Sequence, residues 1–271
     1  WTAIFALLQS PQSSLEEINL GGNSMDYTAA NLLANALTTN TRLKILNLAE
    51  SYHIISVGWR ALFDALQSPH CILEKLILSS NGFDDEDVTY LSNSLVNNCT
   101  LKCLGLSDNN EITAAGWRAF SAVLQNPHSA LEKIDLSLNS INDEALVSFA
   151  NSLMHNNKLK ELYLDHDDDN EENITNWEAL SNVLCNKSSI DATFNSNHTL
   201  QWVFEPDEDD DGESDEYELP SDLQNLLQLN RGHTKMEAAR RKILEVHFSG
   251  EFSMQPFIDM DLKTLPHAIA W

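Results

Sequence analysis

Basic residues are scarce in this 271-residue chain, which has 16 lysines and arginines against 41 aspartates and glutamates and a formal net charge of −25. Such a surface repels phosphate backbones, so the charge argues against general nucleic-acid binding and favours a basic protein as partner. Long apolar runs are also missing, and no stretch approaches the roughly 20 apolar residues of a membrane-spanning helix. We therefore expect neither nucleic acid nor a membrane among the partners.

Cysteines are few, and none of them forms a Cys-x-x-Cys pair. Cys71, Cys99, Cys103 and Cys185 thus match neither a zinc site nor the disulfide framework of a small secreted domain. Four Asn-x-Ser/Thr triplets occur, but an asparagine-rich chain contains such glycosylation patterns by chance. We expect reduced thiols in an intracellular, cytoplasmic protein.

Signatures of catalysis are absent as well: the chain has no Gly-rich phosphate loop, no Gly-x-Ser-x-Gly elbow and no His-Glu-x-x-His pair. Several polar residues recur instead at a constant interval, as Arg60 does with Arg118 and His70 with His128. Residues that repeat with a structural period belong to the scaffold more often than to an active site. The sequence therefore predicts a non-enzymatic protein without a cofactor or a metal site.

The dominant feature that is present is a repeat. The phrase Leu-x-x-Leu/Ile-x-Leu starts at Leu15, Leu43, Leu73, Leu101, Leu131 and Leu159, in steps of 28, 30, 28, 30 and 28 residues. Short and long units alternate, so the full period is a pair of about 58 residues. The long units are marked by tryptophans: Trp1, Trp59, Trp117 and Trp177.

Each unit predicts a short strand, a bend and a helix. The leucines alternate with polar or small residues, as in a strand with one buried face. An asparagine or a substitute follows three positions after the phrase; this column consists of Asn23, Asn81, Asn109 and Asn139, with Ser51 and Asp167 in the other units. An amide side chain both donates and accepts hydrogen bonds, so a stacked column can satisfy the backbone of neighbouring bends. Apolar residues at helical spacing follow, such as Phe120, Val123 and Leu124.

This pattern resembles the leucine-rich repeats of the ribonuclease-inhibitor type over residues 1–190. The resemblance implies a right-handed α/β solenoid with a curved parallel sheet inside and helices outside. Curvature also follows from two spacings, because parallel strands lie about 4.8 Å apart and packed helices about 8–10 Å apart. The strand side should therefore be concave.

The chain divides by composition into five segments: 1–14, the end of a truncated repeat; 15–190, six repeats alternating about 28 and 30 residues; 191–204, a degenerate terminal repeat; 205–218, an acidic loop; and 219–271, a capping region. The acidic loop has ten acids in fourteen positions and cannot order itself by burying apolar surface. The capping region predicts a small helical lid, with Thr234 and Glu237 as a capping box. The polar face of that second helix is expected to carry Lys235, Arg240, Arg241 and Lys242.

The best candidate site is the concave strand face. Its outward positions are Glu17, Asn19, Ile45, Asn47, Lys75, Ile77, Cys103, Gly105, Lys133, Asp135, Glu161 and Tyr163, joined by Asp165 after the last strand. Solenoids bind partners along such surfaces, and exposed Ile45, Ile77 and Tyr163 would favour an interface over a merely solvated face. We expect a basic protein partner there; the sequence leaves the oligomeric state open.

Two alternatives stay open. Leucine-rich repeats followed by an acidic segment also resemble the GTPase-activating protein of the Ran system, which uses an arginine beyond an early strand. Here those bends carry Gly21, Gly22, Glu50, Ser51 and Ser80. The second alternative is a calcium-responsive protein, because Asp207-x-Asp-x-Asp-Gly212-x5-Glu218 matches an EF-hand loop. Ser214 stands where that loop has an aliphatic residue, and Pro206 precedes it where a helix should end.

Overall fold

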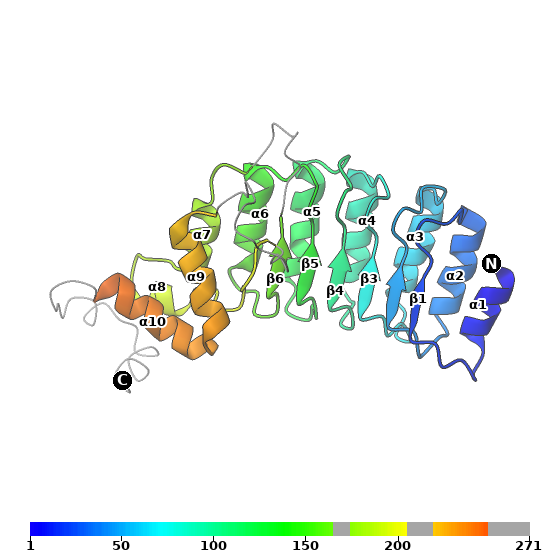
Figure 1. The fold of residues 1–271 in the computed structure, drawn as a ribbon, viewed down its shortest axis with the longest axis horizontal. Coiled ribbons are helices and arrows are strands. Elements are labelled where there is room, and N and C mark those ends of the chain that lie inside the picture. The colour runs from blue at the N-terminus through cyan, green and yellow to red at the C-terminus, as the bar shows by residue number, and fades with distance from the viewer. Residues whose placement is uncertain (165–173, 205–218, 249–271) are drawn as a thin grey trace, which may run out of the picture.

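The computed structural model describes residues 1–164, 174–204 and 219–248. Six three-residue strands form one parallel sheet in chain order (Figure 1). They are β1 (Glu17–Asn19), β2 (Ile45–Asn47), β3 (Lys75–Ile77), β4 (Cys103–Gly105), β5 (Lys133–Asp135) and β6 (Glu161–Tyr163). The predicted α/β solenoid is confirmed.

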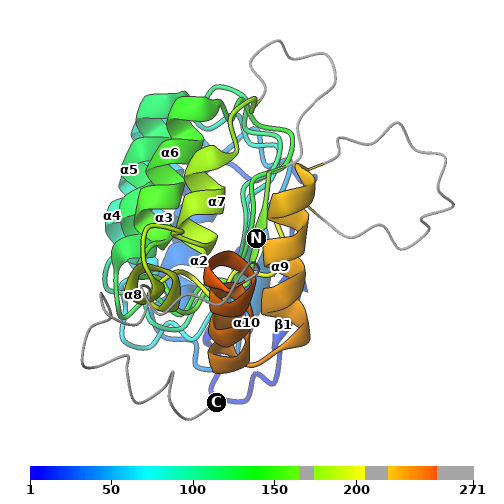
Figure 2. The same ribbon diagram turned by 90° about the vertical axis from the view of Figure 1, so that its left-hand side faces the viewer.

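One helix, α1 (Thr2–Gln9), precedes β1, and a helix follows each strand; α2 to α7 lie on one side of the sheet (Figure 2). They are α2 (Tyr27–Leu37), α3 (Ser56–Ala65), α4 (Asp85–Leu95), α5 (Ala114–Gln125), α6 (Asp143–Leu153) and α7 (Glu178–Leu184). After them come α8 (Ile190–Phe194), α9 (Ser221–Gly232) and α10 (Lys235–His247). Figure 2 shows α9 on the side of the strands away from α4, α5 and α6, and α10 across the C-terminal end.

The strands form because their central residue is apolar and buried. Leu46, Leu76 and Leu104 occupy matching positions on neighbouring strands and are each at most 3% exposed. The helices bury the opposite wall of the same core. Trp117, fully buried in α5, contacts Phe120 and Phe149 with ring centroids 6.1 Å apart in both pairs. Trp117 therefore fills the space between α5 and α6.

The asparagine column forms a ladder at the bend after each strand. Asn109 Nδ2 donates to the carbonyl oxygens of Leu106 and Leu78, which belong to its own rung and the preceding rung. Its Oδ1 accepts from the backbone N–H of Asn81, 3.1 Å away. Asn139 repeats the arrangement one rung later, where its Oδ1 accepts from Asn109 N at 2.8 Å. Each amide thus hydrogen-bonds one bend to the next. Without these bonds, backbone N–H and C=O groups of the bends would be buried without partners.

A second asparagine ladder holds the opposite bends, from helix into strand. Asn98 Nδ2 donates to Leu66 O, and its Oδ1 accepts from the backbone N–H of Leu101. The same two kinds of bond recur at Asn40, Asn156 and Asn197. This column was not among the sequence predictions, although each member stands three positions before the first leucine of a rung. Asn98 and Asn197 also head Asn-x-Thr triplets, and their buried, engaged amides are closed to glycosylation in the folded chain.

The residue before the first asparagine column has a left-handed backbone in five successive units. The φ angles lie between 53° and 67° at Gly22, Glu50, Ser80, Asp108 and Leu138. Glycine adopts this conformation without strain, whereas a side chain with a Cβ does so at a cost. Leu138 is the bulkiest of the five and is 46% exposed.

Replacing Leu138 with glycine should therefore stabilise the fold. We expect Leu138→Gly to raise the free energy of unfolding by about 0.5–1 kcal/mol, because strain is relieved and little packing is lost. Gly22→Leu, the reverse change at the equivalent position, should lower it by a similar amount. Urea unfolding of both variants tests this; a loss of stability in Leu138→Gly would mean that its side chain packs more than its exposure indicates.

The C-terminal end extends the sheet and then closes it. Trp202 forms a parallel bridge with Glu161, so residues 201–204 lie where a seventh strand would stand. Thr234 and Glu237 form the reciprocal capping box that begins α10. Arg231 of α9 stacks on the Trp202 ring, with its Cζ 3.8 Å from the ring centroid. The cap is therefore fastened to the last rung.

Lys242 corrects the expectation for the polar face of α10. Its side chain is 0% exposed and lies on the buried face with Ala238, Ala239 and Ile243. Its Nζ donates to Leu184 O at 2.7 Å and Asn197 O at 3.3 Å, and lies 3.3 Å from His198 Nδ1. Burial lowers the pKa of Lys242 to about 7. Burial, and then nearby Lys242, lower the pKa of His198 to about 4.

Candidate partner-binding surface

The concave strand positions differ in how far they reach solvent. Glu17 and Asn19 on β1 are exposed. Most of the others are half-buried: Ile45, Asn47, Lys75, Ile77, Cys103, Lys133, Asp135 and Glu161. Gly105 is buried, and Asp165 lies outside the described residues. The sheet thus presents its outward side chains as expected for most of the set, with Tyr163 as the main exception.

Tyr163 was expected to be an exposed aromatic residue, and that expectation is wrong: its side chain is 3% exposed. Its Oη donates to Glu161 Oε2 at 2.8 Å, and Lys133 Nζ lies 4.3 Å from its ring centroid and 3.4 Å from Glu161 Oε2. Burial, followed by the Glu161 hydrogen bond, raises the pKa of Tyr163 to about 12. These three residues satisfy one another instead of presenting groups to a partner.

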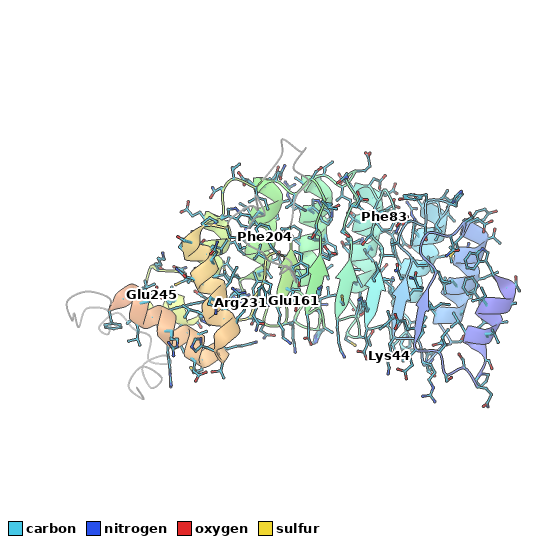
Figure 3. The ribbon with its side chains drawn as sticks, viewed as in Figure 1. Lys44, Phe83, Glu161, Phe204, Arg231 and Glu245 are labelled. Atoms are coloured by element: carbon cyan, nitrogen blue, oxygen red, sulfur yellow. The ribbon has the colours of Figure 1, made fainter. Side chains whose placement is uncertain are left out.

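The reason lies in the rung that follows β6. Leu162 N donates to Trp202 O and Leu164 N donates to Val203 O, so β6 is an internal strand rather than an edge. Figure 3 shows Arg231 of α9 close to Glu161 in this view, and Arg231 contacts Trp202, the bridge partner of Glu161. The rung at Trp202 thus covers the β6 end of the concave face, and the surface over β1 to β4, away from that rung, stays open.

A cluster of exposed apolar side chains, not predicted from the sequence, lies where the chain passes from the strands into α2 and α3. We call it the rim patch, and it consists of Tyr27, Tyr52, Ile55 and Val57, between 50% and 64% exposed. They come from the first turns of α2 and α3 and from the loop after β2. The two helices approach closely there, because a Cβ on Gly58 would lie 3.1 Å from Tyr27 Cα.

The repeat itself makes the rim patch unusual. One period of 58 residues later, the four equivalent positions hold Asp85, Asn110, Thr113 and Ala115. The scaffold therefore does not require apolar side chains there. Exposed carboxylates of Asp26 and Glu50 flank the patch in sequence. The difference between residues one full period apart in the sequence could have predicted the rim patch.

Charged residues at the N-terminal ends of the strands neutralise one another. Just before the strands, Lys44 pairs with Glu16 at 2.9 Å, Lys102 with Glu74 at 2.7 Å and Lys160 with Glu132 at 2.6 Å. We call these six residues the edge row; Lys44, labelled in Figure 3, marks its position. Its signs alternate from rung to rung, so it presents little net charge to a partner.

Comparison with known proteins agrees with the repeat architecture. A family model described as "Leucine Rich repeat" matches residues 70–92, 97–121 and 128–150. This chain is a leucine-rich repeat protein. Its relatives include mouse NACHT, LRR and PYD domains-containing protein 14, 31% identical over 179 residues, which are 66% of this chain and 17% of that protein. Mouse NACHT, LRR and PYD domains-containing protein 5 is 32% identical over 161 residues, which are 58% of this chain and 13% of that protein.

The leucine-rich repeat chain thus spans less than a fifth of the length of these curated relatives. Two solved structures are also similar. The tropomodulin C-terminal domain of Caenorhabditis elegans has a TM-score of 0.44 and 16% identity, covering 57% of this chain and 91% of that one. Leiomodin-1 actin-binding site 2 has a TM-score of 0.33 and 16% identity, covering 89% and 92%.

The arginines of this leucine-rich repeat protein that recur with the period lie in helices. Arg60 of α3 pairs with Glu86 and stacks on Tyr90, while Arg118 of α5 pairs with Glu144. The bends that an arginine would occupy in a Ran-type GTPase activator hold the glycine, glutamate and serine residues noted above. These two arginines thus join one helix to the next.

The EF-hand match at 207–218, within the acidic loop 205–218, lies outside the described residues, as do residues 165–173 after β6. Within the described ranges, no group of three or more His, Cys, Asp or Glu side chains is placed to hold a metal ion. Nor is any helix in those ranges long and apolar enough to cross a bilayer. The four cysteines are free thiols.

Proposed function

We propose that this leucine-rich repeat protein is a non-enzymatic interaction module that binds a basic protein partner on its concave face. The surface over β1 to β4 and the adjoining rim patch would form the contact. The observation that carries the proposal is the rim patch, where large exposed apolar and aromatic side chains stand in place of three polar residues and one alanine one period later.

The composition of this surface suits a protein partner. Aromatic side chains bury a large area with little loss of conformational entropy, and tyrosine is enriched among residues that dominate binding energy. Tyr27 and Tyr52 of the rim patch supply such groups, and Ile45 and Ile77 on β2 and β3 are half-buried. Because Asp26 and Glu50 border them, a partner that combines apolar side chains with lysine or arginine would fit better than a purely apolar one.

Net charge supports a basic partner on a longer range. By sequence, residues 165–172 hold six acids and residues 205–218 hold ten, together sixteen of the 41 in the chain. The described residues that precede these segments, Leu164 and Phe204, lie on neighbouring rungs, since Leu164 N donates to Val203 O at 3.0 Å. The negative potential of these acids would raise the rate of association with a basic partner more than it would raise the affinity of the final complex. Free thiols support the accompanying proposal of an intracellular location.

Charge insertion on the concave face should abolish capture. We expect Glu17→Arg/Asn47→Arg to lower the amount of basic protein retained on the immobilised chain by about tenfold, because arginines would repel the partner at the contact. Quantitative mass spectrometry of retained proteins, eluted at moderate salt, measures this.

Glu178→Arg/Asn35→Arg is the matched control, since it makes the same two substitutions and the same charge change on the exposed faces of α7 and α2. It should leave capture unchanged. Equal losses in both double variants would show that only net charge matters, and capture unaffected by the concave variant would contradict the concave-face proposal. Tyr52→Ser/Val57→Ser then tests the rim patch separately.

A further inference from the structure

A cavity of about 260 Å³ lies at the C-terminal end, where the turn between α9 and α10 meets the last rungs. We call it the cap cavity. Its walls come from the start of β6, the loops around 157 and 199, and the end of α9. Every residue that lines it is polar, which disfavours an apolar ligand because pockets for such ligands are lined mainly by hydrophobic side chains.

The cap cavity carries positive charge in a strongly acidic protein. Three lysines line it, Lys158, Lys160 and Lys235, against one carboxylate, Glu132. With neutral histidines this gives a formal charge of +2, whereas the chain as a whole carries −25. Burial lowers the pKa of Lys235, and the proximity of Lys158 and Lys160 lowers it further, so these ammonium groups repel one another.

The repeat accounts for this local excess of cations. In the edge row each lysine is balanced by the glutamate of the preceding rung, and the next rung again supplies a glutamate. After Lys160 the series ends, because Gln201, whose N–H donates to Lys160 O, stands where the next glutamate would be. Lys158 and Lys235 then approach from the loop before β6 and from α10.

The walls are held in place independently of any ligand. Lys235 Nζ donates to Asn157 O at 2.8 Å, which fastens the start of α10 to the loop before β6. Asn230 is 1% exposed, and its Nδ2 donates to Leu200 O at 2.7 Å. A ring nitrogen of His233 lies 3.1 Å from Leu229 O. The cap cavity is thus largely pre-organised, which reduces the entropic cost of binding.

We propose that the cap cavity binds a small phosphate ester. A phosphate monoester carries about −1.5 to −2 charges at neutral pH and three acceptor oxygens, which matches the formal charge of +2 and the surplus of donors. The lysines supply point charges, and Asn157, Thr199 and Gln201 supply neutral donors around them. A nucleic-acid backbone fits poorly, because the remainder of the acidic surface would repel it.

Calorimetric titration of the full chain with glycerol 2-phosphate tests the proposal. We expect a saturable isotherm, and we expect Lys158→Ala and Lys235→Ala each to weaken binding about tenfold, the value of one charge-assisted hydrogen bond. Lys158→Arg should restore most of the affinity. Thermal unfolding of each variant separates loss of binding from loss of fold, because Lys158 and Lys235 are exposed and their removal should not unfold the chain.

The repeat provides matched controls. Lys102 is the edge-row equivalent of Lys160 one period earlier, and Arg42 is the equivalent of Lys158 two periods earlier. Lys160→Ala should weaken binding, whereas Lys102→Ala and Arg42→Ala should leave it within about twofold. Equal weakening by Lys102→Ala and Lys160→Ala would overturn the proposal, because it would indicate diffuse charge attraction.

Two further arms identify the source of the phosphate. In the first arm, the chain is sedimented with vesicles of phosphatidylcholine containing phosphatidic acid. We expect the chain to stay in the supernatant, because an anionic bilayer repels a chain with a net charge of −25. Sedimentation with these vesicles but no isotherm with glycerol 2-phosphate would overturn the proposal. So would the absence of heat with both glycerol 2-phosphate and inorganic phosphate at about 10 mM. Neither failure would touch the concave-face proposal, which uses other residues.

Discussion

Asn109→Ala is expected to lower the free energy of unfolding by about 3–5 kcal/mol, because several buried backbone groups would lose their partners at once. The Asn109 side chain is 0% exposed. Its Nδ2 donates to three carbonyl oxygens, those of Leu78, Leu106 and Ser107. Its Oδ1 accepts from the N–H groups of Asn81 and Phe83. Alanine can replace none of these bonds, and the bend is too enclosed for water to do so.

Asn23→Ala is the matched control for this loss. Asn23 occupies the same column position in the first described rung, but it is exposed and makes only the two donor bonds to Leu20 O and Gly21 O. Water can replace these partners, so we expect a loss of about 1 kcal/mol. Urea unfolding followed by circular dichroism measures both variants. Equal losses at the two positions would contradict the view that burial makes the ladder strong.

Lys242→Met should change the pH dependence of stability. The pKa of Lys242 is about 7 in the folded chain against an ordinary value of 10.5. Between these two values the unfolded chain binds a proton that the folded chain lacks, so the wild-type protein gains stability as the pH rises. The methionine variant lacks this gain. Relative to wild type it should therefore be more favourable at pH 7 than at pH 9.5, by about 3 kcal/mol.

The absolute difference also includes the hydrogen bonds from Lys242 to Leu184 O and Asn197 O, which methionine cannot make. For that reason the change with pH is the quantity to measure, by urea unfolding at both pH values. Lys187→Met is the control, since Lys187 is an exposed lysine in the same region and its removal should give a difference that hardly varies with pH. A pH-independent difference for Lys242→Met would mean that the buried lysine stays charged.

The sequence determined the repeat architecture because its periodic residues act locally. Leucines 46, 76 and 104 recur with the rung spacing, and the paired strands follow from them. Burial of Lys242 could also have been predicted, since Ala238, Ala239 and Ile243 share its helical face. The expectation placed Lys242 on the polar face because lysine is charged, although its helical spacing from those three residues indicates the buried face.

Other features depended on contacts that no local pattern contains. Tyr163 occupies an outward strand position, yet the rung at Trp202 and helix α9 close over that end of the sheet. The cap cavity likewise lies between Lys158 and Lys235, which are distant in sequence. They come together because the turn after α9 places the start of α10 against the loop before β6. Most concave positions did point outward, but the rim patch stands out only against the residues one full period of 58 later.

The alternation of signs in the edge row limits how such a protein can change its length. Removing residues 43–72, a single unit, would place Glu16 beside Glu74 and set like charges against each other on adjacent strands. Removing residues 43–100, a whole pair, would place Glu16 beside Lys102 and keep every contact of the series. Gain or loss of whole pairs of units would therefore preserve the ion pairs between strands. Gain or loss of a single unit would leave like charges side by side at the junction.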